Sequence, residues 1–302
     1  ASDIAAGLGI SPMVVGLTIV GFGTSAPELV VNAVGASHGA TDIAFGNVVG
    51  SNISNLALVL GAAALMMPIY IRGDIVRREI PLLLLGTTMI TALALDGPLE
   101  GRPAIISRTD AVVLMLVFCI FVYIMALDFI RARRKDPLFE NIDASPIVHA
   151  AAKRGWPWIW VITGCALLFF GGETTIRSGV ELATVFGVST TVIGLFVVAI
   201  GTSMPELVTS VIAARRGEAD LALGNVIGSN LFNSLFVLPI SGLIAQIPVP
   251  DGGIGDLAIS WVLAAMLIPI FFLGRARLGR PTGAVLISGY LVYAVFRVTQ
   301  VG

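Results

Sequence analysis

Residues 21–60 read GFGTSAPELVVNAVGASHGATDIAFGNVVGSNISNLALVL, and residues 199–238 read AIGTSMPELVTSVIAARRGEADLALGNVIGSNLFNSLFVL. Aligned without a gap, the two stretches are identical at 20 of 40 positions. Two unrelated apolar helices would share scattered leucines and valines, whereas these stretches share glycine, proline, glutamate, serine and asparagine. The chain therefore contains an internal repeat, and polar residues are part of its pattern.

The composition indicates a membrane protein. Of the 302 residues, 56% are hydrophobic and 12% are charged, and the mean hydropathy is +0.95. A soluble domain carries about 25% charged residues, so a chain this apolar could not keep its surface hydrated. We therefore expect the lipid bilayer as its surroundings. The basic residues lie in short loops rather than on one face, so we expect no nucleic acid partner.

Nine apolar runs are long enough to cross a hydrocarbon core of ~30 Å as helices, which takes roughly 20 residues each. They lie near residues 10–37, 42–70, 79–95, 111–130, 156–178, 187–214, 219–247, 257–273 and 281–299. Each run should be helical, because lipid offers no partner to an unpaired sheet edge. The sequence therefore predicts an all-α polytopic membrane protein with nine visible spans.

The basic residues indicate how these spans are oriented. Fourteen of the 18 lysines and arginines fall in loops on one side: Arg72, Arg77, Arg78, Arg131, Arg133, Arg134, Lys135, Lys153, Arg154, Arg215, Arg216, Arg275, Arg277 and Arg280. The positive-inside rule places that side in the cytoplasm. The two copies then cross the membrane in opposite directions, as inverted-topology repeats of many secondary transporters do. We assign residues 1–130 and 156–302 to the two repeats and residues 131–155 to a cytoplasmic loop.

The start of the chain differs between the copies. Aligning Gly16 with Gly194 places Ala1 opposite Gly179. The second copy has the apolar run 156–178 before that point, and the first copy has no counterpart. We therefore expect the full-length protein to carry one more helix before Ala1, so that the nine visible spans belong to a set of ten.

Each copy carries the motif GTS-x-PE, which places a glutamate in an apolar run: Glu28 in the first copy and Glu206 in the second. A carboxylate inside the membrane costs several kcal/mol and marks an ion path. The proline of the motif lacks an N–H group, so the helix bends and exposes main-chain oxygens beside the carboxylate. The hydroxyl residues three and four positions before each glutamate lie on its helix face: Thr24, Ser25, Thr202 and Ser203.

A second polar pair follows each glutamate at the same separation in both copies: Ser51 with Asn55, and Ser229 with Asn233. The i, i+4 spacing points both members of a pair the same way. With the motif residues they supply six side-chain oxygens per copy, although any single threonine or serine could instead bond only to its own helix. Ca²⁺ takes six to eight oxygen ligands, and the set lacks the histidine or thiolate that zinc and copper prefer. The inventory suits Ca²⁺ or Na⁺ as a transported ion, with no cofactor.

Small residues flank these pairs. The spacing G-x-x-x-G occurs at Gly46 and Gly50 and again at Gly224 and Gly228, and it predicts close helix packing. We interpret the neighbouring amides as packing groups rather than ligands: Asn47, Asn52, Asn225 and Asn230.

Through the paired signatures GTS-x-PE and GN-x-x-GSN-x-x-N, the chain resembles the cation/calcium exchanger superfamily, specifically its prokaryotic sodium/calcium exchangers. The resemblance covers nearly the whole chain and implies ten helices around a central cation cluster. It implies that Glu28 and Glu206, with carbonyls near Thr24 and Thr202, hold Ca²⁺. The flanking Na⁺ sites would use four hydroxyls and two carbonyls: Ser25, Ser51, Ser203, Ser229, Gly21 and Ala199.

The two site asparagines bear on which ions are used. By the same resemblance, Asn55 and Asn233 lie around the central position. Asn233 stands where potassium-dependent exchangers carry aspartate. Because asparagine lacks that negative charge, the resemblance gives no reason to expect K⁺ transport.

These observations predict a secondary antiporter rather than an enzyme, exchanging Ca²⁺ for Na⁺ by alternating access in a prokaryotic inner membrane. Two carboxylates in a low dielectric repel one another, so an empty site is costly and loading by either ion favours switching. Ca²⁺/H⁺ antiport is the nearest alternative, because a proton relieves the same repulsion. An intramembrane hydrolase with paired glutamates and a passive channel are weaker alternatives.

Overall fold

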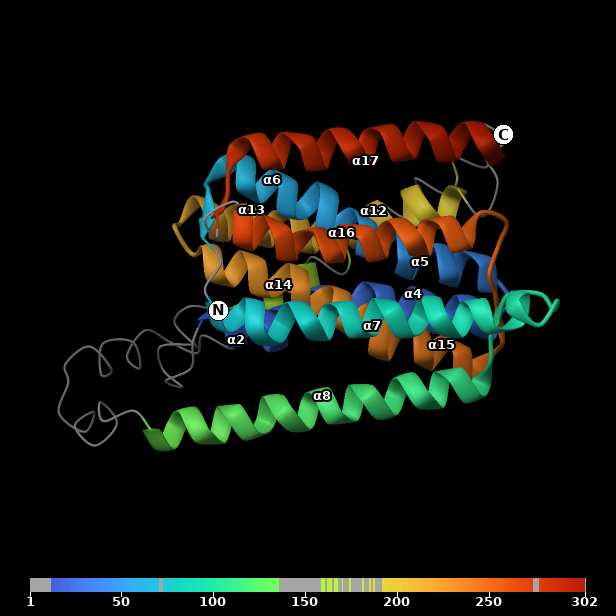
Figure 1. The fold of residues 1–302 in the computed structure, drawn as a ribbon, viewed down its shortest axis with the longest axis horizontal. Coiled ribbons are helices and arrows are strands. Elements are labelled where there is room, and N and C mark those ends of the chain that lie inside the picture. The colour runs from blue at the N-terminus through green and yellow to red at the C-terminus, as the bar shows by residue number, and fades with distance from the viewer. Residues whose placement is uncertain are drawn as a thin grey trace.

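The computed structural model describes residues 12–70, 73–135, 192–273 and 277–301, together with scattered positions between 159 and 187. In this part of the chain, helices run nearly parallel to one another, with α17 (Arg280–Val301) and α8 (Arg108–Lys135) at opposite edges (Figure 1). The remaining helices fill the space between these two.

The first copy of the repeat alternates α-helices with short π-helical turns. Its elements before α8 are α2 (Pro12–Val15), η1 (Gly16–Val20), α3 (Gly21–Thr24), α4 (Ala26–Ser37), α5 (Thr41–Ser54), η2 (Asn55–Val59), α6 (Leu60–Met66), β1 (Ile69–Tyr70), α7 (Gly73–Leu99) and β2 (Ile105–Ile106). The η elements are π-helical turns, a geometry that is often found at functional sites.

The second copy repeats this order. Its elements before α17 are η5 (Ile193–Val198), α12 (Ala199–Thr202), α13 (Met204–Arg215), α14 (Ala219–Phe232), η6 (Asn233–Val237), α15 (Leu238–Ile244), β3 (Ile247–Pro248), α16 (Gly253–Leu273) and β4 (Arg277–Leu278). From α3 to β1, every element begins and ends at positions that the sequence alignment pairs with the bounds of an element in the second copy. The sequence repeat is therefore also a repeat of backbone structure.

Glycine makes the same turn in both copies. Between α4 and α5 the chain passes through Gly39 at φ +77°, and between α13 and α14 it passes through Gly217 at φ +79°. A side chain disfavours this left-handed conformation, whereas glycine adopts it freely. Each turn reverses the chain, so that α5 packs against α4 and α14 packs against α13.

Membrane-spanning helices account for most of the described residues. Six helices are long and apolar enough to cross a bilayer: Thr41–Met66, Glu79–Leu99, Arg108–Leu127, Ala219–Ile244, Gly253–Ile270 and Arg280–Gln300. Two bent helix pairs, Gly16–Thr24 with Ala26–Ser37 and Ile193–Thr202 with Met204–Arg215, meet the same test. These correspond to eight of the nine predicted runs, while the run 156–178 lies largely outside the described residues. The chain is an integral membrane protein.

The spans divide into a sheltered centre and an apolar periphery. In the most apolar windows of Thr41–Met66 and Ala219–Ile244, 83% and 78% of the residues are buried, compared with 28% in both Arg108–Leu127 and Arg280–Gln300. The peripheral helices expose large apolar side chains such as Leu116 and Val292, as lipid contact requires. Polar side chains can therefore be accommodated at the centre, away from lipid.

The two copies are interleaved rather than placed side by side. Helix α17 packs against α6, and α8 packs against α15, so each copy's last helix rests on the other copy. A Cβ atom at Gly46 would lie 3.0 Å from the Leu195 nitrogen, and one at Gly228 would lie 2.7 Å from the Leu17 Cα. The predicted close packing at these glycines is confirmed, and it joins one copy to the other.

The prediction that every run is helical to its end was wrong at two places. Ile69–Tyr70 forms β1, which pairs antiparallel with β4, and Ile247–Pro248 forms β3, which pairs antiparallel with β2. Each pair takes one strand from each copy, so the edge that lipid would leave unpaired is satisfied by the other repeat.

A buried ion pair ties α17 to the start of α16. The Arg297 Nε donates to the Asp256 Oδ1 at 3.0 Å, and the Tyr293 hydroxyl donates to the same oxygen at 2.9 Å. The Arg297 side chain is only 4% exposed. Arg297 lies within the predicted run 281–299 and is a buried structural charge that pairs with Asp256.

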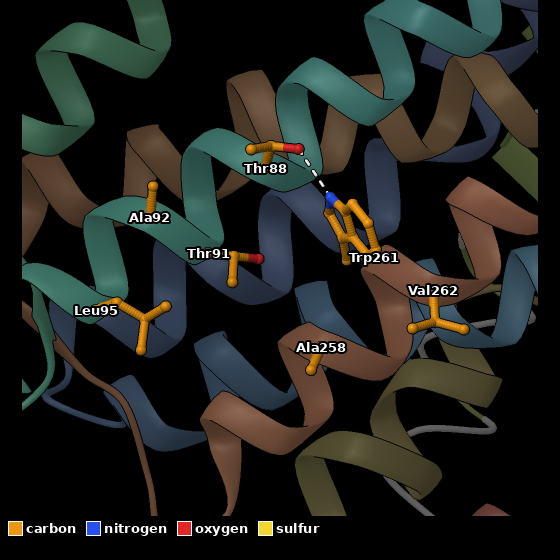
Figure 2. A pocket seen from close by; sticks show the side chains of 7 residues that line it. All are labelled: Thr88, Thr91, Ala92, Leu95, Ala258, Trp261 and Val262. Carbon is orange, nitrogen blue, oxygen red and sulfur yellow. Dashed lines mark hydrogen bonds between the residues drawn. The ribbon is translucent and has the colours of Figure 1, made fainter.

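A groove of about 310 Å³ lies between α7 and α16. Figure 2 shows its lining, in which the Trp261 Nε1 donates to the Thr88 Oγ1 at 2.8 Å. The other lining residues are Thr91, Ala92, Leu95, Ala258 and Val262. None of them is charged, so the groove offers no carboxylate to a cation.

Candidate cation-binding site

Two helix breaks position the glutamates. The segment Gly16–Thr24 meets α4 at Ser25 with a bend of 47°, and the segment Ile193–Thr202 meets α13 at Ser203 with a bend of 45°. Pro27 and Pro205 lie at the start of the helices that follow, where a missing N–H group is tolerated. Both GTS-x-PE motifs therefore bend their helices as the sequence predicts, and each glutamate falls in the first turn after the break.

The two carboxylates are fully buried and lie close enough to interact electrostatically. The Ser25 Oγ donates to the Glu206 Oε1 at 3.1 Å, which joins the first copy to the second. Within the described residues, the Glu206 Oε2 and both carboxylate oxygens of Glu28 accept no hydrogen bond. The pair thus presents three buried anionic oxygens for which the described residues provide no well-formed hydrogen bond, although the Ser51 and Thr202 hydroxyls lie near Glu28.

The serine and asparagine pairs come from the two central spans. Ser51 lies on α5 and Asn55 begins η2, and their counterparts Ser229 and Asn233 lie on α14 and at the start of η6. All four side chains are buried. In the described part of the chain, no amide atom of Asn55 or Asn233 has a hydrogen-bond partner.

The threonine of each motif contacts the serine of the opposite copy. The Thr24 Oγ1 lies 3.4 Å from the Ser229 Oγ, and the Thr202 Oγ1 lies 3.3 Å from the Ser51 Oγ. The members of these pairs are 205 and 151 positions apart in the chain. The fold therefore brings together groups that the sequence could only match as equivalents.

The carbonyls of Gly21 and Ala199 begin α3 and α12. The Gly21 carbonyl accepts the Ser25 N–H at 3.0 Å, and the Ala199 carbonyl accepts the Ser203 N–H at 3.0 Å. The Ser51 Oγ also donates to the Ala199 carbonyl at 3.4 Å. Both carbonyls thus lie at the same polar junction as the side chains, with the π-helical turns η1 and η5 immediately before them.

The unsatisfied oxygens define what this centre can hold. Among the described residues, six buried side-chain oxygens of the predicted set lack a partner: Glu28 Oε1, Glu28 Oε2, Glu206 Oε2, Ser203 Oγ, Asn55 Oδ1 and Asn233 Oδ1. Buried polar atoms are ordinarily paired, so a cluster of orphaned oxygens calls for a ligand. Hard cations take such oxygen ligands. In the described part of the chain, no group of three or more histidine, cysteine, aspartate or glutamate side chains is placed to hold a metal ion.

A layer of hydrogen bonds behind the site was missed by sequence reasoning. Asn47 and Asn225 accept hydrogen bonds from the threonine hydroxyls of the opposite copy, and they are braced in turn by Asn32 and Ser210. The repeat matched Asn47 with Asn225, but the equivalent positions 32 and 210 carry different residues. Only the folded arrangement reveals that these two pairs act alike.

Comparison with known proteins agrees with this geometry. The family model described as sodium/calcium exchanger protein matches residues 1–127 and 156–299. The chain is 38% identical to the putative antiporter CaxA of Alkalimonas amylolytica, over 97% of this chain and 90% of that protein. It is 33% identical to the inner membrane protein YrbG of Escherichia coli K12, over 97% of this chain and 88% of that protein.

A solved structure shares the fold. The sodium-calcium exchanger NCX_Mj, soaked with 2.5 mM Na⁺ and 0.1 mM Ca²⁺, matches with a TM-score of 0.76 and 27% identity. The match covers 96% of this chain and 88% of that one. These similarities point to transport rather than catalysis. With a family model that spans nearly its whole length, this chain belongs to the sodium/calcium exchanger protein family.

Proposed function

We propose that this protein is a secondary antiporter that exchanges Ca²⁺ for Na⁺ across a prokaryotic inner membrane. The observation that carries the proposal is the buried pair Glu28 and Glu206, three of whose four carboxylate oxygens lack a partner within the described residues. Membership of the sodium/calcium exchanger family and the similarity to the sodium-calcium exchanger NCX_Mj support the choice of ions.

The proposed Ca²⁺ site is formed by the two carboxylates, with carbonyls near Thr24 and Thr202. Na⁺ ions would occupy flanking positions that rely on neutral oxygens, and Asn55 and Asn233 would lie around the centre. The residues assigned to the flanking positions are Ser25, Ser51, Ser203, Ser229, Gly21 and Ala199. Burial of all six supports this assignment, because a cation there would be shielded from water.

Coupling follows from competition for the same oxygens. Two carboxylates carry two negative charges, which one Ca²⁺ or two Na⁺ would neutralise. An empty site would leave the like charges of Glu28 and Glu206 facing one another in a low dielectric. We infer that the protein changes its access mainly when it is loaded, which is the requirement for exchange rather than leak.

Alternating access would use the two copies as inverted repeats. Residues 1–130 and 156–302 would form these repeats, with residues 131–155 as the cytoplasmic connection. The recurrence of helix bounds at aligned positions of the two copies supports a symmetry of this kind, and the loop charges support opposite orientations.

The test is ⁴⁵Ca²⁺ flux in proteoliposomes that contain the purified protein. An outwardly or inwardly directed Na⁺ gradient should drive Ca²⁺ in the opposite direction, and addition of K⁺ should not be required. If only a pH gradient drives Ca²⁺ flux, the coupling ion is H⁺ rather than Na⁺. Flux that proceeds without any counter-ion would reject antiport altogether.

A further inference from the structure

The threonine hydroxyls next to the proposed site each point a proton at an asparagine of the opposite copy. The Thr202 Oγ1 donates to the Asn47 Oδ1 at 3.0 Å, and the Thr24 Oγ1 donates to the Asn225 Oδ1 at 3.1 Å. Both asparagines are fully buried, and neither belongs to the proposed ligand set. Their contact with the site is therefore made through the threonines.

In the first copy the direction of these hydrogen bonds is fixed by the main chain. The Asn32 Nδ2 donates to the Ala44 carbonyl at 3.0 Å, and a carbonyl can only accept. The Asn32 Oδ1 therefore faces Asn47 and accepts its Nδ2–H at 2.5 Å. This turns the Asn47 Oδ1 toward Thr202, so the threonine hydroxyl must be the donor.

The consequence concerns the oxygens that remain for a cation. A hydroxyl has one proton, and the other acceptors near the Thr202 Oγ1 are the Ala199 carbonyl at 3.2 Å, the Ser51 Oγ at 3.3 Å and the Glu28 carboxylate. While Asn47 accepts the proton, the Ala199 carbonyl is free of it and the threonine lone pairs stay available. Without Asn47, the proton would turn to oxygens that a cation uses, among them the Ala199 carbonyl of the proposed Na⁺ site.

We propose that Asn47 and Asn225 are positioning residues that keep hydroxyl protons away from the cation site and so set its affinity for Na⁺. This inference rests on the proposed function and adds a specificity determinant to it. Na⁺ depends on neutral carbonyl and hydroxyl oxygens, which these asparagines control. Ca²⁺ draws mainly on the two carboxylates, so its binding should depend on the asparagines much less.

The direction of the Thr24–Asn225 hydrogen bond is less constrained than that of the Thr202–Asn47 hydrogen bond. The Asn225 Nδ2 donates to the Ser210 Oγ at 3.0 Å and, less closely, to the Glu206 carbonyl at 3.4 Å. A serine hydroxyl can donate or accept, so the direction of the Asn225 amide is fixed only by the longer hydrogen bond to the Glu206 carbonyl. The Thr24 hydroxyl has the Gly21 carbonyl of the proposed ligand set at 3.3 Å, as Thr202 has Ala199, but it also has the nearer Val20 carbonyl at 3.0 Å, outside that set. Loss of Asn225 should therefore matter less than loss of Asn47.

The experiment compares Asn47→Leu with the matched variant Asn225→Leu in Na⁺-driven ⁴⁵Ca²⁺ flux. Asn47→Leu should raise the Na⁺ concentration for half-maximal flux by roughly three- to tenfold, the size of one lost hydrogen bond, and that for Ca²⁺ by less than about twofold. Asn225→Leu should shift the Na⁺ value in the same direction by a smaller factor. In a double-mutant cycle, Asn47→Leu should add no further shift to Thr202→Val, because it acts through that hydroxyl.

Equal weakening for Na⁺ and Ca²⁺, or additive effects in the cycle, would overturn the positioning role and leave Asn47 as a packing residue. Should Asn47→Leu fail to fold, Asn32→Leu keeps Asn47 in place but removes the group that orients it, and an unchanged Na⁺ dependence would equally overturn the role. Absence of Na⁺-driven flux in the wild type would reject the proposed function instead. Calorimetric titration of purified wild type and variants with NaCl and CaCl₂ then tests the same ion-selective shift without transport.

Discussion

The two copies of the repeat have the same backbone but different hydrogen bonding around the same residues. From α3 to β1 the helix and strand bounds recur at aligned positions, and both motif helices bend by nearly the same angle, 47° and 45°. Yet Ser25 donates to Glu206, whereas the equivalent Ser203 hydroxyl has no partner in the described residues. Glu28 is correspondingly the less satisfied of the two carboxylates.

This difference indicates that two copies with the same backbone can differ in the hydrogen bonds that their matched side chains form. Matched side chains at matched places still receive different neighbours, such as Asn32 in one copy and Ser210 in the other. A site to which each copy contributes a different set of hydrogen bonds can bind different ions at its two ends. The same substitution made in each copy therefore tests how far the two copies differ in function.

The largest effect is expected from the two glutamates. Glu28→Gln and Glu206→Gln should each reduce ⁴⁵Ca²⁺ flux to near background, because an amide supplies neither the charge nor the bidentate ligation of a carboxylate. The protein should remain folded and inserted, as judged by yield and size-exclusion profile.

Glu100→Gln is the control for these variants, since this glutamate is exposed and forms an ion pair with the neighbouring Arg102. It should leave flux unchanged. Near-normal exchange in both buried variants would remove the glutamates from the proposed site.

A smaller but diagnostic effect is expected from adding charge. Asn233→Asp should place a third carboxylate beside Glu28 and Glu206, where like charges repel in a low dielectric. Protons should then compete with Ca²⁺ more strongly, so flux should fall more steeply at low pH, and a response to K⁺ should appear. Flux is measured across pH with and without K⁺.

Asn55→Asp is the equivalent change in the first copy and tests whether the two asparagines are interchangeable. A matching pH response would make the centre symmetric in charge. An absolute K⁺ requirement in the wild type would contradict the interpretation of Asn233, even if both glutamates retained their role.

The serines of the helix breaks should separate the copies by stability. Ser25→Ala removes a hydrogen bond to a buried carboxylate and should cost about 1.5 to 3 kcal/mol in the absence of Na⁺ and Ca²⁺. Ser203→Ala removes a hydroxyl without a partner among the described residues and should cost less than about 0.5 kcal/mol. Thermal unfolding in detergent, without either ion, measures the difference. Equal losses of stability in the two variants would mean that Ser25 and Ser203 are equivalent in solution.

The smallest effect should be the same in both copies. Gly39→Ala and Gly217→Ala each force a side chain into a left-handed conformation, at a cost of about 1 kcal/mol. A Cβ atom at either position would meet nothing within 4 Å, so backbone strain is the whole effect. Matching decreases in Tm with unchanged flux are expected, and clearly unequal decreases would show that the backbone repeat is less regular than its bounds suggest.

The spans and the motif bends were predictable from sequence because their causes are local. A run of apolar residues forms a helix in lipid wherever it lies, and Pro27 and Pro205 bend their own helices whatever packs beside them. The glycines at positions 46 and 228 were likewise identified by spacing alone. The strand ends at Ile69 and Ile247 were not, because each needs a partner strand from the other copy.

The sequence by itself determined that this is a membrane protein with a repeated motif and two glutamates in bent apolar helices, since hydropathy and bending follow from residues close in the chain. Only the tertiary structure decided that Ser25 bonds to Glu206 and that Asn47 faces Thr202. These contacts join residues that are 181 and 155 positions apart, and matched motifs do not reveal whether each side chain meets its own copy or the opposite one. The interleaving of the copies fixes that choice, because close packing at glycine brings the helices of one repeat against the other.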